Sequence, residues 1–329
     1  MEWRLGVTAV AADLDARTIT LSDEEIVSYD GLVIATGVSS RRLSAPGPTR
    51  GRTVLRALEH SSAVRAALQP GKRLVSLGAG FIGCEVAATA RKLGCEVDIV
   101  AIDPAPMFIP LGQEVGSEIQ RRHEATGIRF HLGHTIVETT GDDRVEGVVL
   151  EDGTRLEADI LLETIGSIPN TQWLDGNDLD LANGVLCDPY LRAGGRPGVV
   201  VVGDVARFAN PLFNAPPLRI EHWQTAIDTA GFAARTLLSD LGVTDEEPPP
   251  VSIMPWFWSD QGEVRLTSYG MLGLGNRTEI LEGELNGDCA VAYYRDDEAV
   301  GVALIGMKQK AARYKRWLSD ARKAVLANA

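Results

Sequence analysis

Hydrophobic and polar positions change period several times along the chain, most clearly between residues 74 and 100. A continuous apolar run at residues 74–77 predicts a buried strand, which leads into Gly-x-Gly-x-x-Gly at residues 78–83. A helix is expected from residue 84 to the glycine at position 94, followed by a second strand at residues 95–100. This order of strand, loop, helix and strand is that of a dinucleotide-binding βαβ unit.

Each glycine of this loop has a physical role in such a unit. Gly78 would allow the tight turn, Gly80 would let the backbone approach a pyrophosphate, and Gly83 would let helix and strand pack closely. The N–H groups and partial positive charge at the helix start would favour phosphates. We therefore expect a dinucleotide site here, with Phe81 and Ile82 as the remaining loop residues.

Residues 19–37 and 148–166 repeat one pattern at a constant offset. Each predicts a strand, an acidic turn, a second strand and a buried apolar strand that ends at a glycine, Gly37 or Gly166. Two β segments could share this pattern by chance, but the shared final strand and glycine lower the probability of a chance match. In the second copy the Gly-rich loop precedes the hairpin, so the first copy's loop would lie before residue 1. The chain is therefore expected to begin inside a dinucleotide-binding domain.

The remaining pattern predicts the elements around this unit. A short helix is expected at residues 57–68, and an apolar strand at residues 199–204 ends in Gly-Asp, as in a parallel sheet covered on both faces. Residues 220–240 predict a helix, and residues 242–250, with three consecutive prolines, predict a linker. Several strands and a basic helix are expected in residues 251–329.

The composition is that of a globular protein and narrows the range of partners. The 329 residues are 45% hydrophobic and carry a net charge of −13, which argues against a nucleic-acid partner. No uncharged apolar run is long enough to cross a membrane, and the first residues do not form a signal peptide. The four cysteines form no Cys-x-x-Cys pair, so we expect reduced, structural thiols in a cytoplasmic protein.

Two weaker signals concern a metal and a charged surface. His131 and His134 could form a metal pair, but no further ligand cluster accompanies them, so no metal site is expected. The segment 308–323 holds seven basic residues against one acid, Asp320. This segment is either an electrostatic landing patch for an acidic partner or a solvated terminal helix.

Five stretches occur in a fixed order along the chain. They are Tyr-Asp-Gly-Leu-Val-Ile-Ala-Thr-Gly at 29–37, the Gly-rich loop at 78–83, Gly-Asp at 203–204, Glu-His-Trp at 221–223 and Trp-Phe-Trp-Ser-Asp-Gln at 256–261. Together they resemble the FAD-dependent ferredoxin reductases of the putidaredoxin and rhodocoxin reductase type. Many flavoproteins share the single motifs, but the last stretch is much more specific. The resemblance covers essentially the whole chain.

The resemblance implies an α/β fold with two dinucleotide-binding (Rossmann-like) domains and a small C-terminal α/β interface domain. The FAD-binding domain is expected to be N-terminally truncated, because its Gly-rich segment is lacking, and to be interrupted by the NAD-binding domain. The expected boundaries are 1–71 for the first part of the FAD-binding domain, 72–170 for the NAD(P)-binding domain, 171–250 for the second FAD part with the linker, and 251–329 for the interface domain.

The resemblance also implies an activity. NAD(P)H gives a hydride to FAD, which passes single electrons to a small iron–sulfur protein, a ferredoxin that serves an oxygenase. The implied cofactors are FAD and NAD(P)H. The implied partner is an acidic ferredoxin, for which the segment 308–323 is the candidate landing patch.

Several residues match cofactor-binding positions of the family. Asp204 corresponds to the acid that binds the ribityl and phosphate part of FAD, although it could simply cap a strand end. Trp223 corresponds to a residue beside the flavin pyrimidine ring at a helix start, although it could be a core aromatic. The other matching FAD positions are Val7 near the adenine, Thr36 and Gly37 at a turn beside the nucleotide, and Arg56 near the flavin, which could also be a solvated helix arginine. The glycine that ends the second copy of the repeat, Gly166, joins these cofactor positions.

Glu85 is the candidate catalytic residue, two positions after Gly83. In similar proteins this glutamate pairs with a lysine next to the reactive nitrogen of the flavin, and that lysine would lie before residue 1. Alternatively, Glu85 is an acid favoured in the first turn of a helix. A surface-facing side chain would favour this alternative, whereas a buried one would lack its lysine partner in this chain.

Two departures from the family pattern affect cofactor binding. The second strand of an NAD-binding unit usually ends in an acid that binds the adenosine ribose, but here Ala101 holds that place and Asp103 follows. Asp103 would repel a 2′-phosphate, so NADH is favoured over NADPH. The second departure is the absent first Gly-rich loop, which makes tight FAD binding doubtful. A disulfide reductase and a nucleotide-binding remnant without flavin chemistry remain alternatives.

Overall fold

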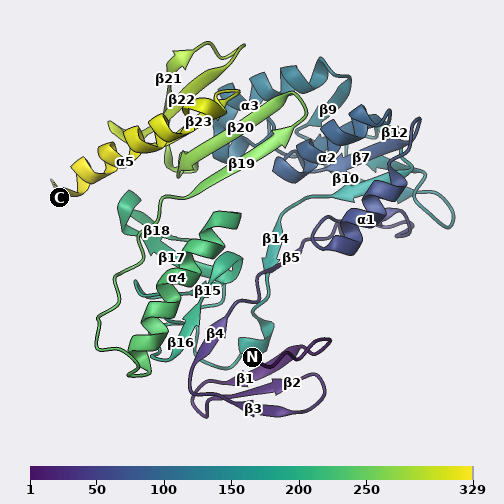
Figure 1. Cartoon of the computed structure of the whole chain (residues 1–329). Helices are drawn as coiled ribbons and strands as arrows, with labels where there is room; N and C mark the ends of the chain where they lie inside the picture. The colour runs from purple at the N-terminus through teal and green to yellow at the C-terminus, as the bar shows by residue number, and fades with distance from the viewer. Residues whose placement is uncertain (328–329) are drawn as a thin grey trace. The chain divides into compact units, whose positions relative to one another are not determined.

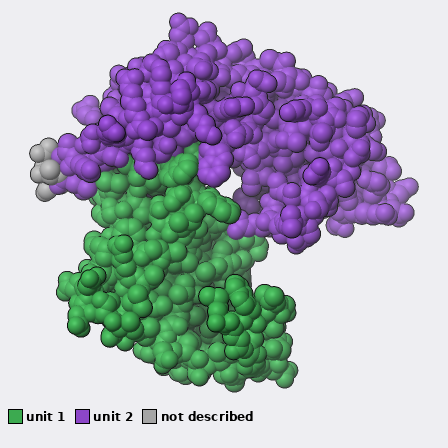
Figure 2. Space-filling model, in the orientation of Figure 1, with its two compact units in different colours: residues 1–39, 168–257 green, residues 40–167, 258–329 purple. Residues whose placement is uncertain are grey.

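The chain, described over residues 1–327 by a computed structural model, forms two compact units that each combine two separate segments. Unit 1 consists of Met1–Ser39 and Ile168–Phe257, and unit 2 of Ser40–Ser167 and Trp258–Ala329 (Figure 2). Each unit is therefore closed by segments that lie far apart in the sequence. The four domain boundaries expected from the sequence stay a prediction.

The nucleotide-binding part of unit 2 is a five-stranded sheet with parallel pairing (Figure 1). Its strand order is β6 (Arg52–Thr53), β13 (Ile160–Glu163), β7 (Arg73–Leu77), β8 (Glu96–Ala101) and β9 (Ile128–Leu132). The helices of this part are α1 (Leu58–Ala67), α2 (Phe81–Lys92) and α3 (Phe108–Glu124). The chain runs from β7 outward to β9 and returns to β13 on the other side, so the strand order reverses between β7 and β13.

The central strands β7 and β13 are mostly apolar, because both of their faces are covered. All four residues of β13 are buried, as are the last four of β7, and Leu74, Val75 and Leu161 are fully enclosed. A three-stranded antiparallel sheet, with β10 (Ile136–Thr140), β11 (Gly147–Leu150) and β12 (Arg155–Glu157), adds its own buried residues to this core.

The second segment of unit 2 forms an antiparallel sheet closed by a helix. The strand order is β19 (Trp256–Gln261), β20 (Val264–Gly270), β23 (Glu298–Ile305), β22 (Cys289–Arg295) and β21 (Arg277–Gly283). Helix α5 (Ala311–Ala327) packs on β20 and β23. The expected α/β unit of strands followed by a basic helix is confirmed.

Unit 1 contains a parallel pair of strands, β4 (Leu32–Ile34) and β16 (Val199–Val201), with helix α4 (Trp223–Asp240) packed against β16. Two three-stranded sheets complete it. They are β1 (Ala9–Asp13), β2 (Thr18–Leu21) and β3 (Ile26–Ser28), and β15 (Val185–Leu186), β17 (Ala206–Asn210) and β18 (Ala215–Leu218). The short strands β5 (Val38–Ser40) and β14 (Ser167–Pro169) pair with each other.

The sequence pattern predicted the start of helix α2 three residues too late. Helix α2 begins at Phe81, directly after Gly80, rather than at residue 84. Gly80 acts as the residue before the helix, with φ −76° and ψ −174°, so the last part of the Gly-rich motif is already helical. Glu85 is therefore the fifth helical residue, and the first turn of α2 contains no acid.

In the described residues, 1–327, no helix combines the length and apolar character needed to cross a membrane.

Candidate functional site

The three glycines of the 78–83 loop occupy physically different positions. Gly78 has φ +109°, and a Cβ there would lie 2.4 Å from the Thr164 carbonyl oxygen. A Cβ on Gly83 would lie 2.2 Å from the Gly78 oxygen, so the helix start rests directly on the turn. A Cβ on Gly80 would meet nothing within 4 Å. The protein's own packing therefore requires glycine at two positions, and the third faces open space of the kind that a pyrophosphate needs.

The loop is held where the strand order reverses. The Thr164 hydroxyl donates a hydrogen bond to the Leu77 carbonyl at 3.0 Å, joining the ends of β13 and β7. The Cys84 amide donates to the Gly80 carbonyl at 3.0 Å, which begins the helical ladder. Parallel sheets bind ligands at this crevice, and the helix N-terminus adds a partial positive charge there. The residues present thus fit a bound dinucleotide, and Thr164 is a site-shaping residue that sequence reasoning missed.

Glu85 lies on α2, and its side chain is half-buried rather than surface-facing. Its carboxylate accepts a hydrogen bond from the Ser259 hydroxyl of β19 at 2.5 Å, and the backbone amide of Asp260 is a second donor. Burial, opposed by these hydrogen bonds, raises the pKa of Glu85 above its ordinary value. The interpretation of Glu85 as a first-turn acid is therefore wrong. The carboxylate has a partner in this chain, in the segment 256–261 that the sequence had singled out.

In unit 1, Thr36 and Gly37 form a fixed turn against Asn170. The Thr36 hydroxyl donates to the Asn170 carbonyl at 2.8 Å, and the Asn170 side-chain amide donates to the Thr36 carbonyl at 2.9 Å. The Asn170 backbone amide donates to Gly37, whose φ of +62° favours glycine. The repeat's glycine at position 166 has φ +95° and is exposed, and its cofactor role stays a prediction.

Asp204 follows a tight turn at the carboxyl end of β16. Gly203 has φ +70°, and its amide donates to the Thr229 hydroxyl of α4 at 3.1 Å. Two buried polar atoms near the start of α4, His222 Nδ1 and Thr225 Oγ1, have no hydrogen-bond partner within the described chain. An acid at a strand end, a helix start and unsatisfied polar atoms fit a polar ligand such as the flavin nucleotide. Sequence reasoning did not single out Thr225, which carries no motif signal.

Trp223 is the first residue of α4 and is 76% exposed, so the alternative of a core aromatic is wrong. Ile227, one turn later on the same helix face, is 54% exposed. Val7 is half-buried in unit 1, and Arg56 is exposed in unit 2. The flavin-contact roles of Trp223, Val7 and Arg56 stay predictions.

The histidines named as a possible metal pair serve other contacts. His131 Nε2 lies 2.9 Å from the buried Asp98, which also receives two hydrogen bonds from Arg129. Although burial opposes ionisation, the bonds from Arg129 and His131 hold the pKa of Asp98 below its ordinary value. His134 lies 3.8 Å from Glu151. Among the described residues no group of three His, Cys, Asp or Glu side chains is placed to hold a metal.

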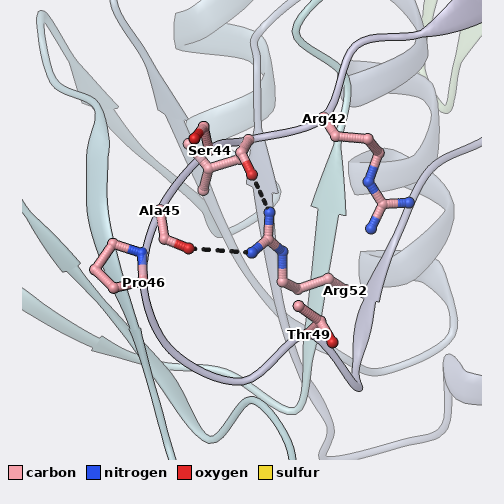
Figure 3. Close-up of a pocket in the computed structure, with 7 residues that line it drawn as sticks. Arg42, Ser44, Ala45, Pro46, Thr49 and Arg52 are labelled. Atoms are coloured by element: carbon pink, nitrogen blue, oxygen red, sulfur yellow. Dashed lines mark hydrogen bonds between the residues drawn. The ribbon is translucent and has the colours of Figure 1, made fainter.

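A pocket of about 560 Å³ in unit 2 lies beside the strap of residues 42–52 (Figure 3). Its most buried cation, Arg52, donates to Glu163 at 2.6 Å and to the Leu43 and Ala45 carbonyls. Glu163 is itself fully buried and also pairs with Arg42 at 2.7 Å. Because Arg52 is already bonded on three sides, this arrangement ties the strap to the end of β13 rather than presenting a cation to a ligand.

The four cysteines of the chain are free and buried. Burial raises the pKa of Cys84 and Cys187 to about 12, and that of Cys289 to about 11. Burial also raises the pKa of Cys95. Thiols in such environments supply little thiolate, so these side chains are structural, as the sequence predicted.

The basic C-terminal segment is only partly free to bind a partner. Lys310 and Arg313 pair with Glu282, and Arg322 is fully buried and pairs with Glu298. The remaining basic side chains are exposed; they are Lys308, Lys315, Arg316 and Lys323.

Comparisons with known proteins identify the family. Residues 1–230 match the pyridine nucleotide-disulphide oxidoreductase family, and residues 256–329 match the reductase C-terminal family. The chain is 33% identical over 319 residues to the ferredoxin–NAD(+) reductase component of the p-cumate 2,3-dioxygenase system of Pseudomonas putida, covering 96% of this chain and 75% of that protein. It is 31% identical over 323 residues to putidaredoxin reductase CamA of Pseudomonas putida, covering 96% and 74%.

A solved structure, the covalent putidaredoxin reductase–putidaredoxin complex, matches with a TM-score of 0.88 at 29% identity, covering 96% of this chain and 75% of that chain. This match confirms the expected α/β fold with two dinucleotide-binding domains and a C-terminal domain. The chain therefore belongs to the pyridine nucleotide-disulphide oxidoreductase family, as an oxidoreductase of the ferredoxin reductase type that uses FAD and NAD.

Proposed function

We propose that this protein passes electrons from NADH through FAD to a small iron–sulfur protein that serves an oxygenase. The observation that carries the proposal is the joint match of the chain to the oxidoreductase family and to the C-terminal reductase family, with relatives named as ferredoxin–NAD(+) reductases. When bound, FAD accepts electrons in pairs and releases them singly, which suits a one-electron acceptor.

The residues of this chain have separable roles in that activity. The 78–83 loop and the start of α2 bind the nucleotide diphosphate through close backbone approach and a favourable dipole. The Thr36–Gly37 turn and Asp204 would hold the flavin nucleotide, and Trp223, exposed at the start of α4, would lie against the flavin ring. Glu85 is the carboxylate that acts beside the loop, held by hydrogen bonds from β19.

The nucleotide preference follows from the end of β8. That strand ends at Ala101, where no side chain can bond the adenosine ribose, and Asp103 lies two residues further. A 2′-phosphate carries a negative charge that Asp103 would repel. These residues support NADH as the electron donor.

The exposed cations of the C-terminal segment are the proposed contact for the ferredoxin. Lys315 and Arg316 are exposed neighbours on α5, and within the described residues neither forms an ion pair, unlike Lys310 and Arg313, which pair with Glu282. A local positive surface on a protein with a net charge of −13 would steer an acidic partner to this face.

One alternative, a disulfide reductase, agrees less well with this chain. A disulfide reductase needs a reactive thiolate, but the pKa values of all four cysteines are raised by burial. The free, buried thiols also support a reducing compartment, and we place the protein in the cytoplasm on that ground. A nucleotide-binding remnant would bind NADH but carry out no flavin chemistry.

The experiment that tests the proposal is the visible absorption spectrum of the purified chain before and after anaerobic NADH. A flavin spectrum that bleaches with NADH and recovers when an oxidised ferredoxin is added is the expected result. A chain that holds no flavin, even after incubation with FAD, would reject the proposal and favour the nucleotide-binding remnant.

A further inference from the structure

A row of buried hydrogen bonds in unit 2 joins Glu85 to a histidine on another helix. The Ser259 hydroxyl lies 2.5 Å from Glu85 Oε1, and Gln261 Nε2 lies 3.0 Å from Ser259 Oγ. Gln261 Oε1 lies 2.8 Å from His123 Nε2 on α3. Ser259, Gln261 and His123 are 1%, 1% and 2% exposed. Burial of a polar side chain costs desolvation free energy. A buried polar network of this kind therefore indicates a structural or functional role.

The bonds in this row have a defined direction. Serine has a single hydroxyl hydrogen, and a carboxylate can only accept, so Ser259 donates to Glu85. Ser259 Oγ then accepts from the Gln261 amide nitrogen, which also faces the Met107 sulfur at 3.3 Å. The Gln261 oxygen must therefore accept from His123, which requires the tautomer with hydrogen on Nε2. Every donor in the row is thus oriented toward Glu85.

We propose that Ser259 is a positioning residue for Glu85: strand β19 supplies a hydroxyl, backed by Gln261 and His123, that fixes the carboxylate beside the dinucleotide loop. This inference rests on the proposed function, because it assumes that Glu85 acts on the bound nucleotide. It also gives residues 258–261 a role within unit 2.

The charged surroundings of Glu85 favour such a role for the serine. Asp260 on β19 carries a like charge and destabilises the Glu85 carboxylate, although its backbone amide donates to Glu85. Cys84, on the same helix, can carry no positive charge, and burial lowers the pKa of His123, so neither side chain offsets this repulsion. Within the described residues, the side chain that donates to the Glu85 carboxylate is that of Ser259.

The contact is not needed to attach β19 and its sheet to the nucleotide-binding part of unit 2. The Tyr293 hydroxyl of β22 donates to the Leu111 carbonyl of α3 at 2.9 Å, and Arg122 donates to the carbonyls of Leu285 and Gly287. Removal of one hydroxyl therefore leaves these attachments in place. The hydrogen bond from Ser259 therefore acts on the Glu85 carboxylate and not on the attachment of the sheet.

The test is a double-mutant cycle on NAD+ affinity with a matched control. Ser259→Ala is expected to raise the dissociation constant of the chain for NAD+ about tenfold, because the Glu85 carboxylate is then no longer held in one position beside the nucleotide. In an E85Q background the same substitution is expected to change the constant less than twofold. Ser268→Ala is the control, because its buried hydroxyl on β20 has no partner in the described structure; it should leave the affinity unchanged.

Two spectroscopic measurements distinguish positioning from mere packing. Carbon-13 NMR of glutamate-labelled chain should show that the pKa of Glu85, assigned with E85Q, rises in S259A and not in S268A. Nitrogen-15 NMR of the unmodified chain should show His123 with hydrogen on Nε2, which keeps the inference testable even if S259A folds poorly.

An unchanged Glu85 titration in S259A, additive effects in the cycle, or an Nδ1–H tautomer of His123 would overturn the inference. These results are distinguishable from failure of the proposed function. A chain that shows the coupling but never bleaches with NADH would retain the positioning role and lose only the ferredoxin reductase activity.

Discussion

Replacing Gly80 by alanine separates the loop's role in ligand binding from its role in folding. The backbone at Gly80, with φ −76° and ψ −174°, is a conformation that any residue adopts, and its Cβ would meet no protein atom within 4 Å. Alanine is poorer than glycine at the residue before a helix, by up to about 1 kcal/mol. It also restricts the unfolded chain, which stabilises by about 0.4–1 kcal/mol. The two effects nearly cancel, so the free energy of unfolding should change little.

The same methyl group would occupy the space that the nucleotide diphosphate needs. Forcing an extra methyl into a filled space typically costs about 1–3 kcal/mol, which corresponds to a rise of roughly 5- to 150-fold in the dissociation constant for NAD+. Gly83→Ala is the contrasting variant, because its Cβ would lie 2.2 Å from the Gly78 oxygen. That substitution should destabilise the fold by a similar energy before any ligand is present.

The assay is a calorimetric titration with NAD+ together with denaturant unfolding of both variants. Gly80→Ala should lose affinity and keep its unfolding midpoint, whereas Gly83→Ala should lose stability. If Gly80→Ala bound NAD+ as tightly as the unmodified chain, the open space at Gly80 would not be the phosphate site, and the assignment of the loop would fail.

Three further predictions concern charge. Burial lowers the pKa of His222 to about 4 from an ordinary value near 6.5, so the unfolded chain takes up this proton first and stability falls as the pH drops from 6.5 to 4. His222→Phe should remove up to about 3 kcal/mol of that fall, as measured by denaturant unfolding at several pH values. Reversing Lys315 and Arg316 to glutamate should raise the KM for ferredoxin several-fold at low salt, about 3- to 10-fold, and less at high salt. The kcat/KM with NADH should exceed that with NADPH, and Asp103→Asn should narrow the ratio by weakening the repulsion of the 2′-phosphate.

The charge reversal on α5 has a matched control, and the other two predictions each have a result that would refute them. Reversal of Arg65 on α1 together with Arg235 on α4 makes the same change in net charge on other exposed surfaces, and it should leave the KM for ferredoxin unchanged. An equal rise in both double variants would reject the patch on α5. A preference for NADPH, or a pH dependence of stability unaltered by His222→Phe, would refute the other two arguments.

The sequence predicted those parts of the site that are local in the chain. The 78–83 loop could be recognised because its glycines, strand and helix are contiguous, and only the helix start was misplaced. The partner of Glu85 could not be identified, since Ser259 lies 174 residues away and contact over that distance depends on how the sheets pack. The hydrogen bond between Arg52 and Glu163 could not be predicted from the sequence for the same reason.

Exposure was equally hard to predict from the sequence. Trp223 begins a helix whose apolar residues could face a core or a ligand, and composition does not distinguish the two. The structure shows it 76% exposed. In the basic segment 308–323 the sequence suggested free cations, but three of its seven cations are paired with acids in the folded chain.

The pairing of β4 with β16 has a consequence for synthesis of the protein. Leu32 pairs with Val199, so the ribosome adds more than a hundred residues after β4 before its partner strand exists. At about 5–20 residues per second, β4 waits on the order of ten to thirty seconds. Residues 40–167, which lie between the two strands, contribute to the other unit and can begin folding during that interval. Unit 1 is therefore completed late, and a pause or a chaperone acting in this window would change the yield of folded protein without any change in the stability of the finished fold.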